Sequence, residues 1–205
     1  MQPVDLPPLD ESAVPAAPFP LFDAWINLAV AAALPEPYAV TLATALPDGS
    51  PSARLVLLRG FDERGFVFFT NYLSRKGGEL AANPKAALVF FWAPFSRQVR
   101  IEGRVEKTTD KESDAYFHSR PVGHRLGAFA SPQSQVLPGR RPLEEKMAEM
   151  ERTYANGDMP RPDWWGGYRV VPDVIEFWQG QLNRLHDRIR YRRVGADWVI
   201  ERLAP

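Results

Sequence analysis

Alternation of apolar and polar positions is the clearest signal along the chain, and it predicts many short strands. Residues 97–107 alternate strictly, with Val99, Ile101 and Val105 on one face and charged or amide side chains on the other. This pattern is typical of a strand that is wet on one side. Apolar runs separated by turn sequences predict the remaining strands. They cover residues 38–45, 53–59, 66–70, 86–92, 168–171, 174–178, 188–193 and 198–203.

Helical spacing occurs in only a few segments. Residues 21–34 carry apolar side chains at helical intervals, and two prolines end the predicted helix. Thr109 and Glu112 have the spacing of a capping box, so a helix should follow them. Another helix is expected over residues 142–156, and Ser74 is a candidate cap for a further one.

These elements indicate a mainly β fold with flanking helices. Many short strands without an alternation of strand and helix favour an antiparallel barrel that closes on itself. The first twenty residues include six prolines and little periodicity. We therefore expect a flexible or loosely docked arm over residues 1–20, outside the core, and a single domain over residues 21–205.

The composition excludes several classes of protein. The 205 residues are 45% hydrophobic, as in globular proteins, and 25 basic residues balance 25 acidic ones. Zero net charge gives no global attraction to nucleic acid or to an anionic membrane. Absence of cysteine excludes disulfides, thiolate catalysis and cysteine-ligated metals, and with three histidines we expect no metal centre.

A cytoplasmic location is expected. The longest apolar run, residues 24–34, is shorter than the roughly 20 residues that cross a bilayer. It also lacks the basic flank of a secretory signal, because the first basic residue is Arg54. Since all basic residues follow position 53, an anion site should lie in the remainder of the chain.

One charged loop follows an aromatic strand near the C-terminus. Arg184, His186, Asp187 and Arg188 lie within five residues, a group able to orient and polarise a bound ligand. A solvated turn with a surface ion pair explains the same residues equally well. The basic tract 188–193 is a possible nucleic-acid stripe, but zero net charge favours an ordinary strand.

Further cations are candidates for binding phosphate. Arg75 and Lys76 fall at a predicted helix start, where free backbone amides also favour anions. The strand over 54–59 has an arginine at each end, and Tyr116 and Arg120 share one helix face. Each group alone is compatible with a solvated surface. Together they exceed what one phosphate needs and suggest two phosphorylated ligands.

Nine short motifs occur in order between residue 21 and the C-terminus. They are Arg54-Leu55-Val56-Leu57-Leu58, Phe69-Thr70-Asn71, Ser74-Arg75-Lys76-Gly77, Arg97-Gln98-Val99, Tyr116-Phe117-His118-Ser119-Arg120-Pro121, Ser131-Pro132-Gln133-Ser134, Trp165-Gly166-Gly167-Tyr168, Glu176-Phe177-Trp178-Gln179-Gly180 and Arg184-Leu185-His186-Asp187-Arg188. With them the sequence resembles the pyridoxamine 5'-phosphate oxidase family, flavin enzymes that make pyridoxal 5'-phosphate.

The resemblance implies an FMN-binding split β-barrel that works as a homodimer, with FMN at the subunit interface. The positions that match FMN contacts are Arg54, Leu55, Val56, Leu57, Leu58, Phe69, Thr70, Arg75, Lys76, Gln98, Gln133, Ser134, Trp178 and Arg188. Those that match substrate contacts are Arg59, Tyr116, Arg120, His124, Arg184, Leu185 and His186. Arg184 and His186 are the implied catalytic residues.

Three positions depart from the usual family pattern. Arg59 stands where the family commonly has lysine, and His124 stands where it commonly has serine. Both belong to the implied pocket for the substrate phosphate. Phe69 replaces the more frequent tyrosine.

The implied activity is FMN-dependent oxidation of pyridoxamine and pyridoxine 5'-phosphate by oxygen, giving pyridoxal 5'-phosphate and hydrogen peroxide. Two alternatives stay open, because a fold hosts many functions. The first is a split-barrel flavin oxidase or reductase that acts on another aromatic substrate. The second is a non-catalytic protein that binds flavin or pyridoxal phosphate. Neither nucleic acid nor a membrane is an expected partner.

Overall fold

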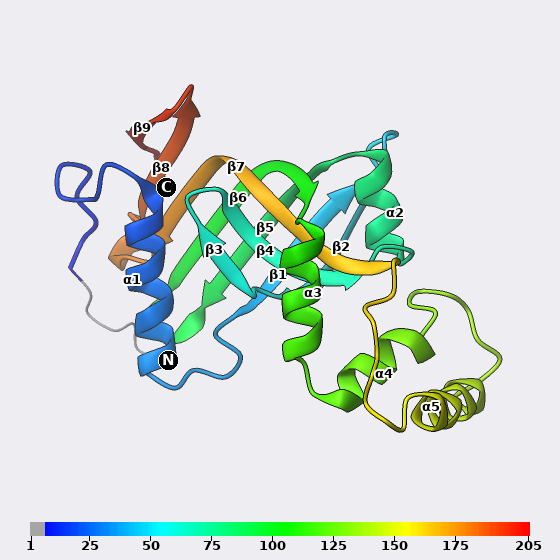
Figure 1. Ribbon diagram of the computed structural model, residues 1–205. Helices are drawn as coiled ribbons and strands as arrows, with labels where there is room; N and C mark the ends of the chain where they lie inside the picture. Colours follow the sequence, from blue (N-terminus) through cyan, green and yellow to red (C-terminus); the bar gives the residue numbers. More distant parts are fainter. Residues whose placement is uncertain (1–6) are drawn as a thin grey trace.

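A computed structural model describes residues 7–205 and contains one antiparallel sheet, curled into a half-barrel with helices around it (Figure 1). The strands are β1 (Ala39–Ala45), β2 (Pro51–Leu57), β3 (Gly60–Asp62), β4 (Gly65–Asn71), β5 (Lys85–Trp92), β6 (Arg97–Lys107), β7 (Trp165–Gln179), β8 (Asp187–Val194) and β9 (Asp197–Arg202). Their hydrogen-bonded order is β2-β1-β5-β6-β7-β4-β3, and β8 pairs with both β7 and β9. The mainly β, antiparallel prediction is confirmed.

The expected full closure of the barrel is wrong. The strands β2 and β3 lie at opposite ends of the sheet order, and no ladder joins them within residues 7–205. The split falls between two adjacent residues. Leu58 donates its N–H to Tyr38 on the β1 side, whereas Arg59 donates to Val67 on the β4 side. The chain therefore crosses from one edge of the sheet to the other at this point.

The helices follow local capping signals. They are α1 (Pro18–Ala31), α2 (Arg75–Ala82), α3 (Asp110–Ser119), α4 (Val122–Ala130) and α5 (Arg141–Thr153), with 3₁₀ turns η1 (Ala93–Phe95) and η2 (Leu182–Arg184). The capping box of Thr109 and Glu112 and the Ser74 cap are both present. Helix α4 was not predicted, because Gly123 and Gly127 weaken the helical pattern. Within residues 7–205, no helix is both long and apolar enough to cross a membrane.

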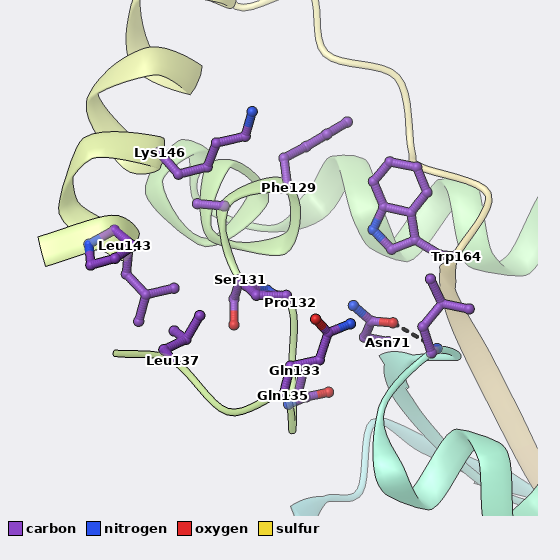
Figure 2. A pocket seen from close by; sticks show the side chains of 13 residues that line it. Asn71, Phe129, Ser131, Pro132, Gln133, Gln135, Leu137, Leu143, Lys146 and Trp164 are labelled. Atoms are coloured by element: carbon purple, nitrogen blue, oxygen red, sulfur yellow. Dashed lines mark hydrogen bonds between the residues drawn. The ribbon is translucent and has the colours of Figure 1, made fainter. Parts of the chain in front are cut away.

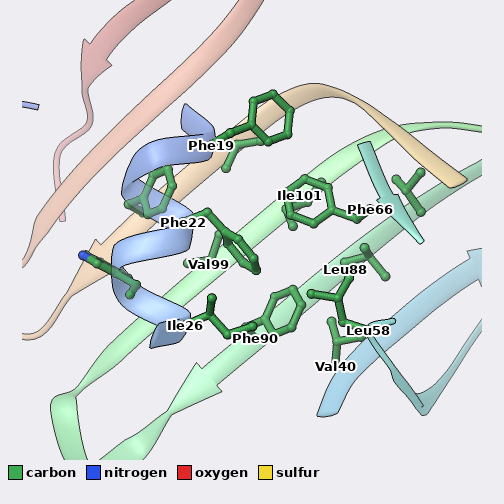
Figure 3. Packing of buried hydrophobic residues seen from close by; sticks show 14 of the residues in the cluster. Phe19, Phe22, Ile26, Val40, Leu58, Phe66, Leu88, Phe90, Val99 and Ile101 are labelled. Carbon is green, nitrogen blue, oxygen red and sulfur yellow. The ribbon is translucent and has the colours of Figure 1, made fainter. Parts of the chain in front are cut away.

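The core lies between α1 and the concave face of the sheet. Figure 3 shows Phe22 and Ile26 of α1 directed at the strands. The ring of Phe22 meets Phe66 of β4 and Phe90 of β5 edge-on, with centroids 4.9 and 5.2 Å apart. Burying side chains of this size stabilises the fold by about 2 to 3 kcal/mol each. Helix α1 therefore holds the two halves of the sheet together.

Part of the expected arm, residues 1–20, belongs to the folded core. The N–H of Leu9 donates to Asp187 at 3.1 Å, and Leu9 and Phe19 lie in the main buried cluster. The expectation that this segment stays outside the core is wrong for these residues. Phe19 belongs to the first turn of α1, which begins three residues before the predicted helix. Leu9 is held by a residue 178 positions away, so no local periodicity marks it. Residues 1–6 lie outside the described part.

The strand β7 is continuous where the sequence predicts two strands, 168–171 and 174–178. Pro172 lacks an N–H, and β6 and β7 shift register beside Gly103 opposite it. A Cβ at Gly103 would lie 2.0 Å from the carbonyl oxygen of Val171, so only glycine fits this close approach. The proline interrupts the sequence pattern but not the strand.

Candidate functional site

A cavity of about 720 Å³ is lined by residues of β2, β4, α2, α3 and α4. Its volume falls in the range of small-molecule sites, about 300 to 1,000 Å³. Many predicted site residues line it: Leu55, Val56, Leu57, Arg59, Phe69, Thr70, Lys76, Tyr116, Arg120, His124 and Gln133. The fold thus brings together predicted site residues that are up to 78 positions apart, from Leu55 to Gln133, and adds Trp165, 110 positions from Leu55.

Three stacked aromatic rings form one part of the cavity lining. The rings of Phe69 and Tyr116 lie 4.0 Å apart between centroids and 20° from parallel. Trp165 stacks on Phe69 at 5.7 Å and 12°. Gly167 of β7 allows this packing, because a Cβ there would lie 2.8 Å from the Phe69 ring. Flat rings in this arrangement suit a flat aromatic ligand.

Two arginines approach this stack, and neither has an acidic partner among residues 7–205. The guanidinium of Arg120 lies 4.6 Å from the Trp165 ring centroid, and that of Arg59 lies 5.9 Å from the Tyr116 centroid. Within residues 7–205, Nη1 of Arg120 is buried without a hydrogen-bond partner. Burial lowers the pKa of Arg120, although a guanidinium remains charged. An unpaired buried cation of this kind favours a bound anion.

Lys76 occupies another part of the cavity, in the first turn of α2. Its ammonium contacts only neutral oxygens within residues 7–205: Thr70 Oγ1 at 3.2 Å, and Ser74 Oγ and Gln133 Oε1 at 3.3 Å. Burial lowers the pKa of Lys76, Arg54 lowers it further, and a nearby carboxylate opposes both. The cation and the helix N-terminus together favour a phosphate.

Four predicted FMN residues of the same region do not line the cavity. Arg54 and Arg75 both bond to the carboxylate of Glu79, at 2.8 Å each. Leu58 is 3% exposed and packs in the main core. Ser134 follows the cavity residue Gln133 and has a φ of 73°, a left-handed conformation that is uncommon outside glycine.

A second group of predicted residues forms a row across three strands. Gln98 of β6 pairs with Trp178 of β7, and Trp178 pairs with Arg188 of β8. Directly paired residues point to the same face of a sheet, so the three side chains lie side by side. Arg188 also donates to Glu176 at 2.8 Å, which raises its pKa.

The loop before β8 carries the implied catalytic residues beside this row. The His186 ring lies 4.8 Å from the Trp178 ring, and its Nδ1 accepts the N–H of Gln181 at 3.1 Å. Neutral His186 therefore carries its proton on Nε2. Leu185 is exposed, and Arg184 has a φ of 62°. Such left-handed strain is common at functional sites.

Within one copy of the chain, the residues of the row and of the loop before β8 do not line the cavity. Gln98, Trp178, Arg184, Leu185, His186 and Arg188 are all absent from the cavity lining. In Figure 1, β8 and β9 lie at the opposite end of the molecule from α4 and α5. The predicted site is thus divided into two halves on each protomer.

Sequence reasoning did not assign several lining residues. Trp165 belongs to a quoted motif but had no predicted role, and its ring is part of the aromatic stack. Asn71, Ser119, Pro121, Gly123, Gly127, Ala128 and Ser131 line the same cavity. Most of them belong to α4 or its flanks. Leu126 and Ala130, four residues apart and buried, are the one local signal for that helix.

A smaller cavity of about 500 Å³ adjoins the main one and shares Asn71, Ser131 and Gln133 with it. Figure 2 shows Phe129, Leu143 and Trp164 around it, together with Lys146 of α5. Its lining is mostly apolar and offers fewer polar groups than the main cavity.

The main cavity meets the requirements of FMN. The ligand has a flat ring system and a phosphate, and the cavity offers stacked aromatic rings and a buried lysine at a helix N-terminus. The unpaired Nη1 of Arg120 provides a donor for a second anion. No group of three His, Cys, Asp or Glu side chains within residues 7–205 is placed to hold a metal ion.

Comparison with known families assigns both parts of the chain. A model described as pyridoxamine 5'-phosphate oxidase matches residues 26–154. A second, described as the pyridoxine 5'-phosphate oxidase C-terminal dimerisation region, matches residues 165–205. The second match contains the Trp178–Arg188 row and the Arg184–His186 loop, and it supports a homodimer.

Individual relatives have names of the same family. The chain is 58% identical over 198 residues to a pyridoxine/pyridoxamine 5'-phosphate oxidase of Trichormus variabilis, covering 96% of this chain and 92% of the relative. It is 59% identical over 200 residues to one of Burkholderia multivorans, covering 96% and 93%.

Solved structures show the same fold. PhzG from Burkholderia lata, in complex with tetrahydrophenazine-1-carboxylic acid, superposes with a TM-score of 0.92 at 35% identity, over 98% of this chain and 99% of that one. An FMN-binding protein from Nostoc punctiforme superposes with a TM-score of 0.70 at 19% identity, over 94% and 100%. The chain belongs to the pyridoxamine 5'-phosphate oxidase family of FMN-dependent oxidases, and FMN is its cofactor.

Proposed function

We propose that this chain oxidises pyridoxine 5'-phosphate and pyridoxamine 5'-phosphate with oxygen, giving pyridoxal 5'-phosphate and hydrogen peroxide. The main support is that one cavity holds two separate cationic groups, Lys76 in one part and Arg59 with Arg120 in the other. Stacked aromatic rings of α3 and β4 also line it. Two phosphorylated aromatic ligands account for this arrangement. The names of the relatives at 58% and 59% identity support the same substrates.

In this proposal the cofactor phosphate lies at the start of α2. Lys76, Thr70 and Gln133 bind it from the cavity side, and Arg54 and Arg75 approach from the side of Glu79. The backbone N–H groups of the first turn of α2 add to the attraction. When bound, FMN supplies the two-electron acceptor and the centre that reacts with oxygen.

The substrate phosphate lies near α3 and the start of α4. Arg59, Arg120, Tyr116 and His124 surround that part of the cavity. Arg120 projects from the end of α3, whose register is fixed by the capping box at its other end. When these cations bind the phosphate, the pyridine ring attached to it is directed toward the aromatic stack.

The missing half of the site comes from a second copy of the chain. In a homodimer, Arg184 and His186 of the partner subunit lie over the cavity of the first protomer. They align the C4' carbon of the substrate and exclude water from it. Alignment alone lowers the barrier by several kcal/mol, because translational freedom is lost on binding.

Oxidation of pyridoxine 5'-phosphate removes a hydride from C4' and a proton from its hydroxyl, and oxygen takes up both electrons. The hydrogen bond from Gln181 leaves neutral His186 with a proton on Nε2. His186 is therefore suited to donate a hydrogen bond to the substrate oxygen, rather than to remove its proton. The role of proton acceptor is left to another group or to water.

A second candidate function follows from the structural neighbour PhzG, whose complex holds tetrahydrophenazine-1-carboxylic acid. A flat carboxylated ring would also fit stacked aromatic residues and arginines. The paired cations favour a phosphorylated substrate, since a carboxylate needs fewer donors than a phosphate.

The direct experiment is an absorbance titration of the yellow protein without oxygen. Pyridoxine 5'-phosphate should bleach the flavin band, and admitting oxygen should restore the band and release one equivalent of peroxide. Bleaching by a reduced phenazine carboxylate alone would favour the second function. No bleaching by any substrate would indicate a binding protein.

A further inference from the structure

The carboxylate of Glu79 is the centre of a buried polar cluster behind the start of α2. Its side chain is 3% exposed, and it accepts hydrogen bonds from Thr44 at 2.6 Å and from Ser52 at 2.7 Å. Arg54 and Arg75 each donate to it at 2.8 Å. The four partners come from β1, β2 and α2, so both carboxylate oxygens are fully bonded.

The arrangement depends on local helix geometry. Glu79 lies four residues after Arg75 in α2, which places both side chains on one face of the helix. The opposite partner, Arg54, reaches Glu79 from β2, where its Nη1 also donates to Thr44. Burial raises the pKa of Glu79, but its hydrogen bonds outweigh this and lower the pKa to about 2. The carboxylate is therefore charged at every working pH.

The cluster leaves only part of each arginine available. Both Nη groups of Arg54 are bonded within it, and within residues 7–205 only Nε of Arg54 has no hydrogen-bond partner. Arg75 uses only Nε toward Glu79, and within residues 7–205 its two Nη groups have no hydrogen-bond partner. Lys76, the next residue, presents its ammonium to the cavity. Three cations this close repel one another, as the lowering of the Lys76 pKa by Arg54 indicates. Glu79 opposes that repulsion, because it raises the Lys76 pKa.

A buried ion cluster adds little net stability to the contact between two strands and a helix. Burying charges costs about as much as their attraction returns, and apolar residues of similar size serve equally well. We therefore explain the cluster by its effect on the two arginines, whose positions it fixes. A preorganised set of donors binds an anion more tightly, since less side-chain entropy is lost on binding.

We propose that Glu79 is a positioning residue for the cofactor phosphate: it holds Arg54 and Arg75 beside Lys76, so that these three cations converge on one phosphate. The inference deepens the proposed function, since it rests on the placement of the FMN phosphate at the start of α2. Glu79 itself does not touch the flavin.

The test compares two ligands that differ only in the phosphate, FMN and riboflavin. Each is titrated into flavin-depleted full-length protein, and binding is followed by quenching of flavin fluorescence. For Glu79→Gln we expect the Kd of FMN to rise roughly tenfold or more, the scale of hydrogen bonds to charged groups. The Kd of riboflavin should change by less than about twofold, since riboflavin has no phosphate for the arginines to bind.

Glu145→Gln is the matched control. Arg141 and Glu145 form an ion pair with the same order and spacing as Arg75 and Glu79, but exposed on α5. This variant should leave both affinities unchanged. If Glu79→Gln does not fold, Ser52→Ala removes one donor to Glu79 and an acceptor for Arg54. It should weaken FMN binding in the same selective way, by a smaller factor.

The possible results distinguish failure of the Glu79 inference from failure of the proposed function. Equal losses for FMN and riboflavin would show that Glu79 serves only the fold, and tighter FMN binding would show that its charge opposes the phosphate. Either result overturns the inference while the proposed function stands. If the unaltered protein binds FMN no better than riboflavin, the phosphate placement and the inference both fall.

Discussion

The ring of Tyr116 stacks on the ring of Phe69, with centroids 4.0 Å apart and planes 20° from parallel. Phe69 lies in β4, beside the residues proposed to bind FMN, and Tyr116 lies in α3, beside those proposed to bind the substrate phosphate. This contact joins the two parts of the cavity. Stacked pairs of this kind contribute about 0.5 to 1.5 kcal/mol beyond their buried area.

Tyr116→Phe should distinguish the effect of the stacked ring from that of the hydroxyl group. The ring stays in place, so the Kd of FMN should not change. KM for pyridoxine 5'-phosphate should rise about tenfold or more, because a hydrogen bond to a charged group is lost. Steady-state kinetics and flavin titration measure the two effects. Tyr38→Phe, an exposed tyrosine away from the cavity, is the control. An unchanged KM would contradict the placement of the substrate phosphate.

His124 should contribute to binding of the substrate phosphate. It is exposed at the edge of the cavity, in the part proposed to hold that phosphate. His124→Ala should therefore raise KM for pyridoxine 5'-phosphate by about twofold to tenfold, the scale of one lost hydrogen bond, and leave the Kd of FMN unchanged. His118→Ala is the control, since His118 Nδ1 bonds to the Asp114 carbonyl instead of lining the cavity. Equal KM values for the two variants would show that His124 does not meet the phosphate.

Glu79 should contribute to stability in a defined pH interval. Its pKa is lowered from 4.5 to about 2 in the folded protein. A carboxylate with a lowered folded-state pKa stabilises the fold above pH 4.5 and loses that contribution as the pH falls through about 2. The contribution at neutral pH is on the order of 3 kcal/mol.

Unfolding by urea at fixed protein concentration, without added flavin, measures this effect. The difference in free energy of unfolding between the unaltered protein and Glu79→Gln should shrink as the pH falls from about 5 to 2. A difference that stays constant across this interval would mean that Glu79 is not held ionised by its partners.

Two glycine substitutions should have opposite effects. Gly103→Ala places a Cβ 2.0 Å from the Val171 carbonyl oxygen, so it should destabilise the fold by about 2 kcal/mol or more. Gly78→Ala, inside α2, meets nothing within 4 Å and should stabilise by up to about 1 kcal/mol. Thermal unfolding of both variants checks the pair. Equal stabilities would contradict the close approach of β6 and β7.

Local signals in the sequence predicted local structure well. The capping box of Thr109 and Glu112, the Ser74 cap and the alternation over 97–107 each depend on neighbouring residues, and all three are present. Helix α4 contains two glycines and shows only the weak signal of Leu126 and Ala130, and Leu9 bonds to Asp187 far along the chain, so neither was predicted.

The arrangement of the site could be predicted only in part. Motif matching named the residues, but it did not divide them between the cavity and the Gln98–Trp178–Arg188 row. That division follows from strand order, which is a property of the whole sheet. The role of Glu79 was also missed, because its four partners come from three separate elements.

A working site should combine the cavity of one protomer with the loop of its partner. Arg120→Ala removes a cavity residue, and Arg184→Ala removes a loop residue. Each homodimer should have little activity with pyridoxine 5'-phosphate. A mixed dimer, isolated through two different affinity tags, would carry both changes in one site and none in the other.

Oxygen consumption by this mixed dimer with saturating FMN is the decisive measurement. We expect recovery to about half the activity of the unaltered dimer, because one complete site is restored. If each site were built within a single protomer, every site would keep one change. A mixed dimer no more active than its two parents would therefore show that the two protomers do not share a site.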